Sequence, residues 1–184
     1  HSHSPGGRTP DLGRDRRVLN QELRLDSTAT RSAFGVIDRW TLGAYFSSTR
    51  EIGAYTNTDP GNIRGLQTRY NADHIALFGQ IAHDLDAHTR VTLGLRTERV
   101  DLDGRGIKTR YRTARKTFDP EVTFHPVFDD DLLGGKLSLE HDLSDHEVAF
   151  ASVTRGYKAG GINVDARISP PADPLTYGTE TLWN

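Results

Sequence analysis

The segment 134–163, GGKLSLEHDLSDHEVAFASVTRGYKAGGIN, constrains the fold more than any other part of the chain. Apolar and polar residues alternate along two stretches that flank a tight polar turn, Ser144-Asp145-His146, and the segment ends in a glycine-rich tip. A second unit of this kind covers residues 75–100, with the turn Asp86-Ala87-His88. The remaining connections, 49–74, 101–132 and 159–178, are long for a compact soluble domain. Short turns that alternate with long connections predict antiparallel β-hairpins standing in a membrane.

A period of two residues predicts about seven strands, because it separates an apolar face from a polar one. The predicted strands are 19–26, 40–47, 75–85, 89–100, 133–143, 147–158 and 179–184. In each clear case we expect the apolar members to touch lipid and the polar members to line a wet interior. Trp40, at a strand entrance, fits an interfacial aromatic girdle. In segment 75–85 apolar residues occur at both odd and even positions, so the face that meets lipid is ambiguous. In segment 147–158, Val148 and Phe150 are two residues apart and therefore share a face. The connection 27–39 is longer than its place on the short-turn side predicts.

Composition supports strands and excludes membrane-spanning helices. Hydrophobic residues make up 35% of the chain, which is compatible with a barrel wall because only every second position must be apolar. No apolar run approaches the roughly 18–20 residues of a spanning helix. The chain has no cysteine and a net charge of −2, so neither a disulfide framework nor a nucleic-acid partner is expected. The absence of methionine and the abrupt ends lead us to expect a piece of a longer polypeptide.

Seven short segments resemble the TonB-dependent outer-membrane receptor family, in the order and spacing of that family. They are QELRL at 21–25, WTLGAYF at 40–46, ALFGQ at 76–80, TLGLR at 92–96, GGKLSLEHDLSD at 134–145, RGYKAGGIN at 155–163 and ETLWN at 180–184. The resemblance covers the chain from about Asn20 onward. There are two departures: Ile162 replaces the usual aromatic residue, and Thr179 stands where a proline commonly occurs.

The resemblance implies an all-β, antiparallel up-and-down meander that is part of a large transmembrane β-barrel with long extracellular loops. Residues 1–184 would form about seven strands of a wall of about 22, without the plug domain, the TonB box or the C-terminal strand. The implied function is active transport across the bacterial outer membrane, with ferric-siderophore uptake energised through TonB. The implied partners are an iron chelate or another scarce nutrient, the TonB complex through the missing plug, and outer-membrane lipid.

One segment of the predicted outer loop 101–132 is a candidate ligand-binding site. It carries several basic side chains and one aromatic: Arg105, Lys108, Arg110, Tyr111, Arg112, Arg115 and Lys116. Such a loop would attract an anionic iron chelate or lipopolysaccharide phosphates; the alternative is a solvated loop. The triplet Asp129–Asp131 has the chemistry to bind a divalent cation, although acidic triplets more often hydrate a loop. Four charged residues are predicted to face the lumen: Arg96, Glu98, Lys136 and Glu140.

Other chemistry is poorly supported. The glycines Gly156 and Gly161 have the spacing of a phosphate-binding loop, but Ile162-Asn163 follows where lysine and a hydroxyl residue are required. The histidines, at positions 1, 3, 74, 83, 88, 125, 141 and 146, lack metal-ligand spacing. No nucleophile motif is present, so no enzyme, cofactor or metal site is expected. Two rival functions stay open: a passive porin or adhesin-type barrel, and a soluble all-β carbohydrate-active enzyme.

Overall fold

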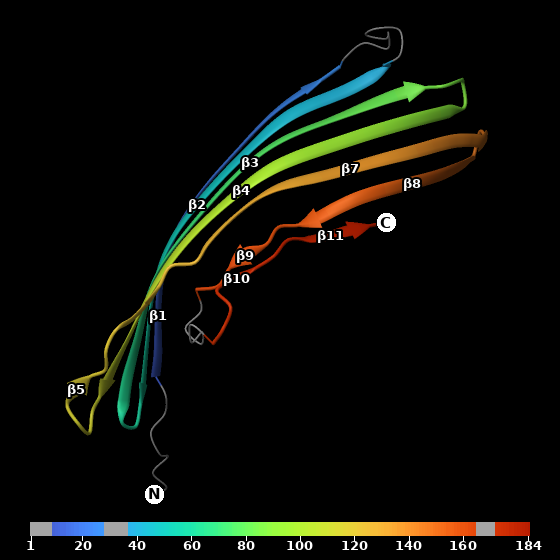
Figure 1. Ribbon diagram of the computed structural model, residues 1–184. Helices are drawn as coiled ribbons and strands as arrows, with labels where there is room; N and C mark the ends of the chain where they lie inside the picture. The colour runs from blue at the N-terminus through green and yellow to red at the C-terminus, as the bar shows by residue number, and fades with distance from the viewer. Residues whose placement is uncertain (1–8, 28–36, 165–171) are drawn as a thin grey trace, which may run out of the picture.

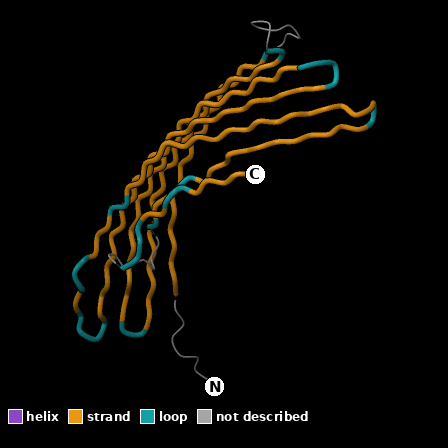
Figure 2. The backbone as a smooth tube through the Cα atoms, turned by 45° about the vertical axis from the view of Figure 1, so that its right-hand side comes forward, coloured by secondary structure: helices purple, strands orange, loops and turns teal. Residues whose placement is uncertain are grey.

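The chain forms a long, curved antiparallel sheet in a computed structural model, which describes residues 9–27, 37–164 and 172–184. Every regular element in these ranges is a β-strand, and they contain no helix that is long and apolar enough to cross a membrane. The tube view shows that the main sheet bends and twists along its length (Figure 2), and a separate two-stranded sheet accompanies it. The sequence-based expectation of an all-β meander is confirmed.

Neighbouring strands in the sheet are also neighbours along the chain, with the order β1-β2-β3-β4-β7-β8-β11 (Figure 1). The strands of this path are β1 (Thr9–Asp26), β2 (Arg39–Asp59), β3 (Asn62–Asp84), β4 (Thr89–Arg112), β7 (Val127–Ser144), β8 (Glu147–Lys158) and β11 (Glu180–Trp183). Two short strands, β5 (Thr117–Phe118) and β6 (Val122–Phe124), pair with β4, while β9 (Gly161–Ile162) and β10 (Thr176–Tyr177) pair with each other.

Two of the three long loops that we expected are instead largely paired strand. Residues 49–59 continue β2 and residues 62–74 belong to β3, so the connection 49–74 is a hairpin closed by Pro60-Gly61. Residues 101–112 continue β4. The prediction failed because many residues of these extensions are polar and the apolar period of two is lost, while the backbone hydrogen bonds of the strand pairing continue. Of the connection 27–39, residues 28–36 lie outside the described residues.

The hairpin at 59–62 has the sequence chemistry of a type II turn. Proline at the first central position fixes its φ near the value that the turn needs, and Gly61 follows with φ of +104°. The backbone N–H of Thr113 donates to the carbonyl of Gly61 at 3.0 Å. The tip of β2–β3 is therefore tied to the end of β4.

Register places the exposed leucines of neighbouring strands in common rows on one face. In the central row, Leu25 pairs with Leu42, which pairs with Gly79, which pairs with Leu95. Leu25, Leu42 and Leu95 are each more than half exposed, although leucine is usually buried in soluble proteins. The ambiguous segment 75–85 is also resolved: Ile75, Leu77 and Ile81 lie on this face, which we call the convex face. Because these exposed leucines share one face, we expect the convex face to contact an apolar environment and not water.

The opposite, concave face carries the four residues predicted to face a lumen. Arg96 is opposite Gly134 and Phe78, Lys136 is opposite Gly94, and Glu140 is opposite Arg90. Because partners in register share a face, these residues lie on one side of the sheet with Glu98. Val148 and Phe150 also belong to this face, since they pair with Asp142 and Glu140.

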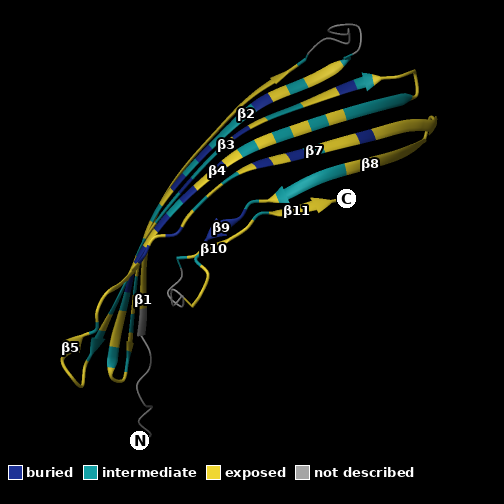
Figure 3. Cartoon of the chain, in the orientation of Figure 1, coloured by how far each residue is buried: buried dark blue, intermediate teal, exposed yellow. Residues whose placement is uncertain are grey.

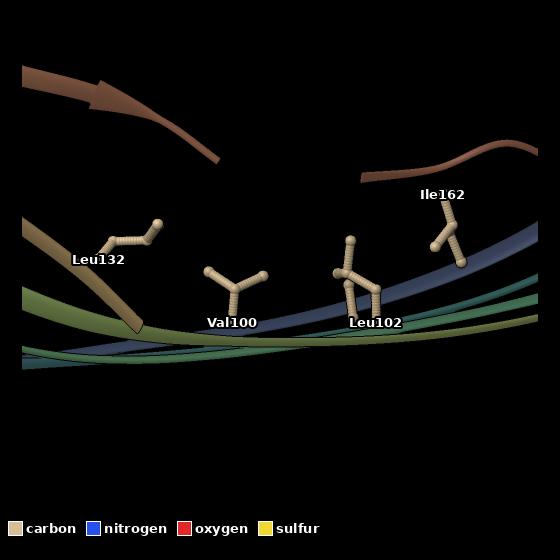
Figure 4. Close-up of a cluster of buried hydrophobic side chains, with 5 residues drawn as sticks. Val100, Leu102, Leu132 and Ile162 are labelled. Carbon is tan, nitrogen blue, oxygen red and sulfur yellow. The ribbon is translucent and has the colours of Figure 1, made fainter. Parts of the chain in front are cut away.

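A cluster of buried apolar side chains lies where the chain after β8 returns across the concave face. It comprises Ala72, Val100, Leu102, Leu132 and Ile162. Figure 3 shows β9 in dark blue, as buried, together with dark blue positions on the wall strands, and the close-up in Figure 4 shows Ile162 opposite the side chains of Val100 and Leu102. Residues 159–162 of the connection 159–178 are therefore packed on the wall, whereas residues 172–178 are mostly exposed.

Candidate functional site

The concave face is hollowed into a trough that crosses several strands. Its volume is about 440 Å³, and its lining includes Arg24, Phe78, Arg96, Lys136 and Tyr157. Arg24 is paired with Asp26 at 3.1 Å. Lys136 makes no ion pair within the described ranges. The trough therefore presents cationic and aromatic groups, which suit an anionic or aromatic ligand.

A network of hydrogen bonds at one side of the trough converges on Glu98. Its carboxylate accepts from Arg96 Nη2 at 2.9 Å and from the Tyr157 hydroxyl at 2.8 Å, and it lies 3.0 Å from His74 Nδ1. Arg96 also donates to Tyr157 Oη at 3.0 Å. The Glu98 side chain is only 12% exposed, so its charge depends on these partners.

Two aromatic rings flank the guanidinium of Arg96. Its Cζ atom lies 5.7 Å from the ring centroid of Tyr45 and 5.9 Å from that of Phe78, which is within cation–π range. The Phe78 ring covers Gly43, its direct partner on β2, where a β-carbon would be 2.2 Å from the ring. Glycine at position 43 thus gives Phe78 room to lie along the wall beside Arg96.

The basic segment predicted to bind ligand is not a loop for most of its length. Arg105, Lys108, Arg110, Tyr111 and Arg112 lie in β4, and only Arg115 and Lys116 are in the turn that follows. Alternation along β4 also divides these residues between the two faces, so the structure does not bring all seven together.

Several of these side chains are engaged within the tip of the sheet. Arg112 Nε donates to Asp119 at 2.6 Å, and Arg110 lies 3.8 Å from the same carboxylate. Lys108 lies over the Phe124 ring, and the Tyr111 ring contacts Phe118 at a centroid distance of 4.9 Å. The described contacts are therefore structural, while a ligand-binding role for the segment stays a prediction.

The hydrogen bond from Arg112, together with the charges of Arg112 and Arg110, lowers the pKa of Asp119 below its usual value. Because the pKa of Asp119 is lowered in the folded state, the Arg112–Asp119 pair stabilises the turn around residues 113–119 at pH values above the ordinary pKa of 3.8. That contribution is lost as the pH falls through the folded pKa. The tip should thus be held by this pair at neutral pH.

Replacing Asp119 with asparagine is expected to loosen the tip at neutral pH. Because Arg115 and Lys116 lie in the adjacent turn, trypsin should cleave there roughly two- to fivefold faster. Limited proteolysis followed by mass spectrometry would measure the rate. Glu121→Gln is the matched control, since Glu121 makes no ion pair in the described part of the chain. Equal rates for both variants would contradict the role of Asp119.

The acidic triplet is divided between the two faces of β7. Asp129 and Asp131 receive hydrogen bonds from Arg99 on the convex face, at 2.9 and 3.1 Å. Asp130 instead accepts from the Thr179 hydroxyl at 2.5 Å. The described residues hold no group of three or more His, Cys, Asp or Glu that is placed to bind a metal ion. His1 and His3 lie outside the described residues.

Sequence reasoning missed the role of Tyr157. The pairing of β7 with β8 ends at Gly135–Arg155, and Tyr157 pairs with Thr181 of β11 instead. Alternation from Arg155 would place Tyr157 on the convex face, whereas its hydroxyl bonds to Glu98. The available signal was the single tyrosine within the segment RGYKAGG. A tyrosine beside glycines at a strand end has both a hydroxyl to donate and room to reach a partner on another strand.

Comparisons with known proteins agree with this architecture. The sequence model of a family described as TonB dependent receptor-like, beta-barrel, matches residues 2–181. The crystal structure of the ferric yersiniabactin uptake receptor FyuA from Yersinia pestis is similar, with a TM-score of 0.74 and 17% sequence identity. The match covers 95% of this chain and 26% of that receptor, so this chain spans about a quarter of its length. None of the curated proteins matches.

Proposed function

The chain belongs to the TonB-dependent receptor β-barrel family, and on that premise we propose that it forms part of the wall of an outer-membrane transport receptor. The receptor would import a ferric siderophore or a similarly scarce nutrient into the periplasm, with energy supplied through TonB. This family consists of transport receptors and not of enzymes. We further propose that residues 1–184 contribute about seven strands, and that a plug domain with its TonB box is supplied elsewhere in the protein.

The observation that carries the proposal is the division of the sheet into two faces. The convex face exposes rows of leucine, as lipid contact requires, and the concave face carries charged and aromatic groups. Strand segments such as 75–85 have the length of about 9–11 residues that crosses a bilayer. The longer strands would then extend beyond the membrane, opposite the short turns, and raise the wall of a vestibule.

Three features support an anionic chelate as the ligand. The trough on the concave face carries the cations Arg24, Arg96 and Lys136, of which Arg24 and Arg96 are paired with Asp26 and Glu98. The basic segment 105–116 would attract an anion electrostatically. The similar Yersinia pestis protein is a ferric yersiniabactin uptake receptor, and we extend that substrate class to this chain only as part of the proposal.

Uptake by the full-length protein that carries this chain would test the proposal. The protein would be expressed in the outer membrane of a strain that lacks its own siderophore receptors, and uptake of radiolabelled ferric chelates would be measured. Uptake that requires TonB supports a receptor. Equal uptake with and without TonB would favour a passive porin, and recovery of the protein in the soluble fraction would contradict a membrane wall.

A further inference from the structure

One connection of the sheet lies against the wall instead of extending the strands. Residues 157–164 and 175–179, which we call the inner strap, include the last two residues of β8 and the short strands β9 and β10. β9 contacts β4 and β7 on the concave face, and β10 pairs with β9 (Figure 1). The connections within β2–β3 and β4–β7 lengthen their strands instead. β8 ends after 12 residues, whereas β4 has 24. The strap therefore occupies space that the other connections leave open.

Apolar packing attaches the middle of the strap to the wall. Ile162 packs with Leu102, Val100 and Leu132, and Val100 is completely buried although it belongs to a single-layered sheet (Figure 4). Tyr157 and Ala159 pack against the same cluster. Moving the strap away would expose this cluster to water, which is unfavourable in proportion to the apolar area exposed.

The wall and the strap fit each other at glycines. At Gly104 an added β-carbon would lie 2.7 Å from Ile162 Cδ1 and 2.9 Å from Val164 Cγ1. At Gly160 it would lie 2.4 Å from the Phe128 ring and 2.4 Å from the carbonyl oxygen of Tyr177. Such close approach is possible only without a side chain, so the fit is specific to this position of the strap.

Polar contacts fix both ends of the strap. At one end the Tyr157 hydroxyl donates to Glu98 at 2.8 Å. At the other end the Thr179 hydroxyl donates to Asp130 at 2.5 Å and accepts from the N–H of Gly160 at 3.1 Å. Within the strap, the N–H of Asn163 donates to the carbonyl of Leu175 at 2.8 Å. Displacement would break contacts at both ends together.

We propose that the inner strap is a fixed constriction of the transport path, which narrows the lumen permanently and does not move during ligand capture. The inference rests on the proposed function, since it assigns one part of the barrel interior a stationary role. The segment RGYKAGGIN then attaches the strap to the wall. Tyr157 bonds to Glu98, Gly160 permits close approach to Phe128, and Ile162 packs in the apolar cluster.

A reversible disulfide would test whether the strap moves. Asp130→Cys with Thr179→Cys, in the full-length protein, joins the strap to the wall where the two native side chains are in contact. Asn20→Cys with Ser47→Cys is the matched control, because these residues pair directly in neighbouring wall strands and their side chains are 2.7 Å apart. Disulfide yield and ferric-chelate uptake would be measured before and after reduction.

We expect the disulfide to form in high yield and uptake to stay within about twofold of the reduced protein, as in the control pair. A loss of roughly tenfold or more that reductant reverses would show that the strap must move, and would overturn the proposal. Failure to form the disulfide would overturn it as well, because the strap would not occupy the described position.

Amide exchange gives a readout that does not depend on transport, so failure of the proposed function can be distinguished. If the strap is fixed, a peptide covering residues 157–164 should exchange as slowly as the centre of β4. Exchange as fast as that of the turn at 113–116 would contradict a fixed strap. If this peptide is protected while no chelate is taken up, the transport proposal fails and the structural proposal stands.

Discussion

Replacing Glu98 with alanine is expected to destabilise the folded wall by about 3 kcal/mol. The substitution removes the acceptor for Arg96 and Tyr157 and the partner of His74 at a carboxylate that is largely shielded from water. Arg96 would stay within cation–π distance of Tyr45 and Phe78 but without a counter-charge. The cost of leaving that charge unpaired is larger than the value of an exposed ion pair. Urea unfolding of the full-length protein in detergent would measure the change.

Glu140→Ala is the matched control, because Glu140 lies on the same face but makes a weaker ion pair. Its side chain is about half exposed, and its carboxylate is as far as 3.9 Å from Arg90. That variant should lose less than about 1 kcal/mol. Glu98→Gln should fall between the two, since it keeps an acceptor for the Tyr157 hydroxyl but loses the charge that Arg96 faces. Equal losses for Glu98→Ala and Glu140→Ala would show that the network around Glu98 contributes nothing special.

Strand faces could be predicted from the sequence where one face is apolar and the other polar, because alternation is then strict. Leu93 and Leu95 of β4 and Leu137 and Leu139 of β7 lie on one face as the period of two predicts. Beyond Thr97 on β4, the convex face changes to Arg99 and Asp101, and the periodic signal ends although the strand continues to Arg112. Hydrogen-bonded pairing needs no apolar residues, so the full strand length was not visible in the sequence.

The candidate site was harder to predict because its contacts join distant residues. Glu98 and Tyr157 are separated by 59 positions, and Asp130 and Thr179 by 49. The basic segment attracted attention through its charge density, yet the pairing of Arg110 and Arg112 with Asp119 depends on the fold of the turn between them. The sequence indicated the composition of the site, whereas the partners followed from the three-dimensional arrangement.

Replacing Leu95 with arginine is expected to destabilise the membrane-embedded protein by about 2–4 kcal/mol. Leu95 lies in the central row of the convex face, beside Leu42 across Gly79, and is more than half exposed. In a soluble protein an exposed leucine could accept a charge at little cost. In a barrel wall the same position faces the middle of the bilayer, where the guanidinium loses its hydration. The change in the free energy of unfolding therefore shows whether the convex face contacts lipid or water.

Two further variants make the measurement specific for depth and for face. Thr97→Arg, two residues along the same face toward the native Arg99, should cost less than Leu95→Arg, because the cost falls to about 0–1 kcal/mol near the interface. Gln80→Arg, on the concave face beside the trough, should be close to neutral because that face is wet. Unfolding in lipid vesicles would rank the three. If Gln80→Arg cost as much as Leu95→Arg, the assignment of lipid and lumen faces would be wrong, and with it the barrel wall on which the transport proposal depends.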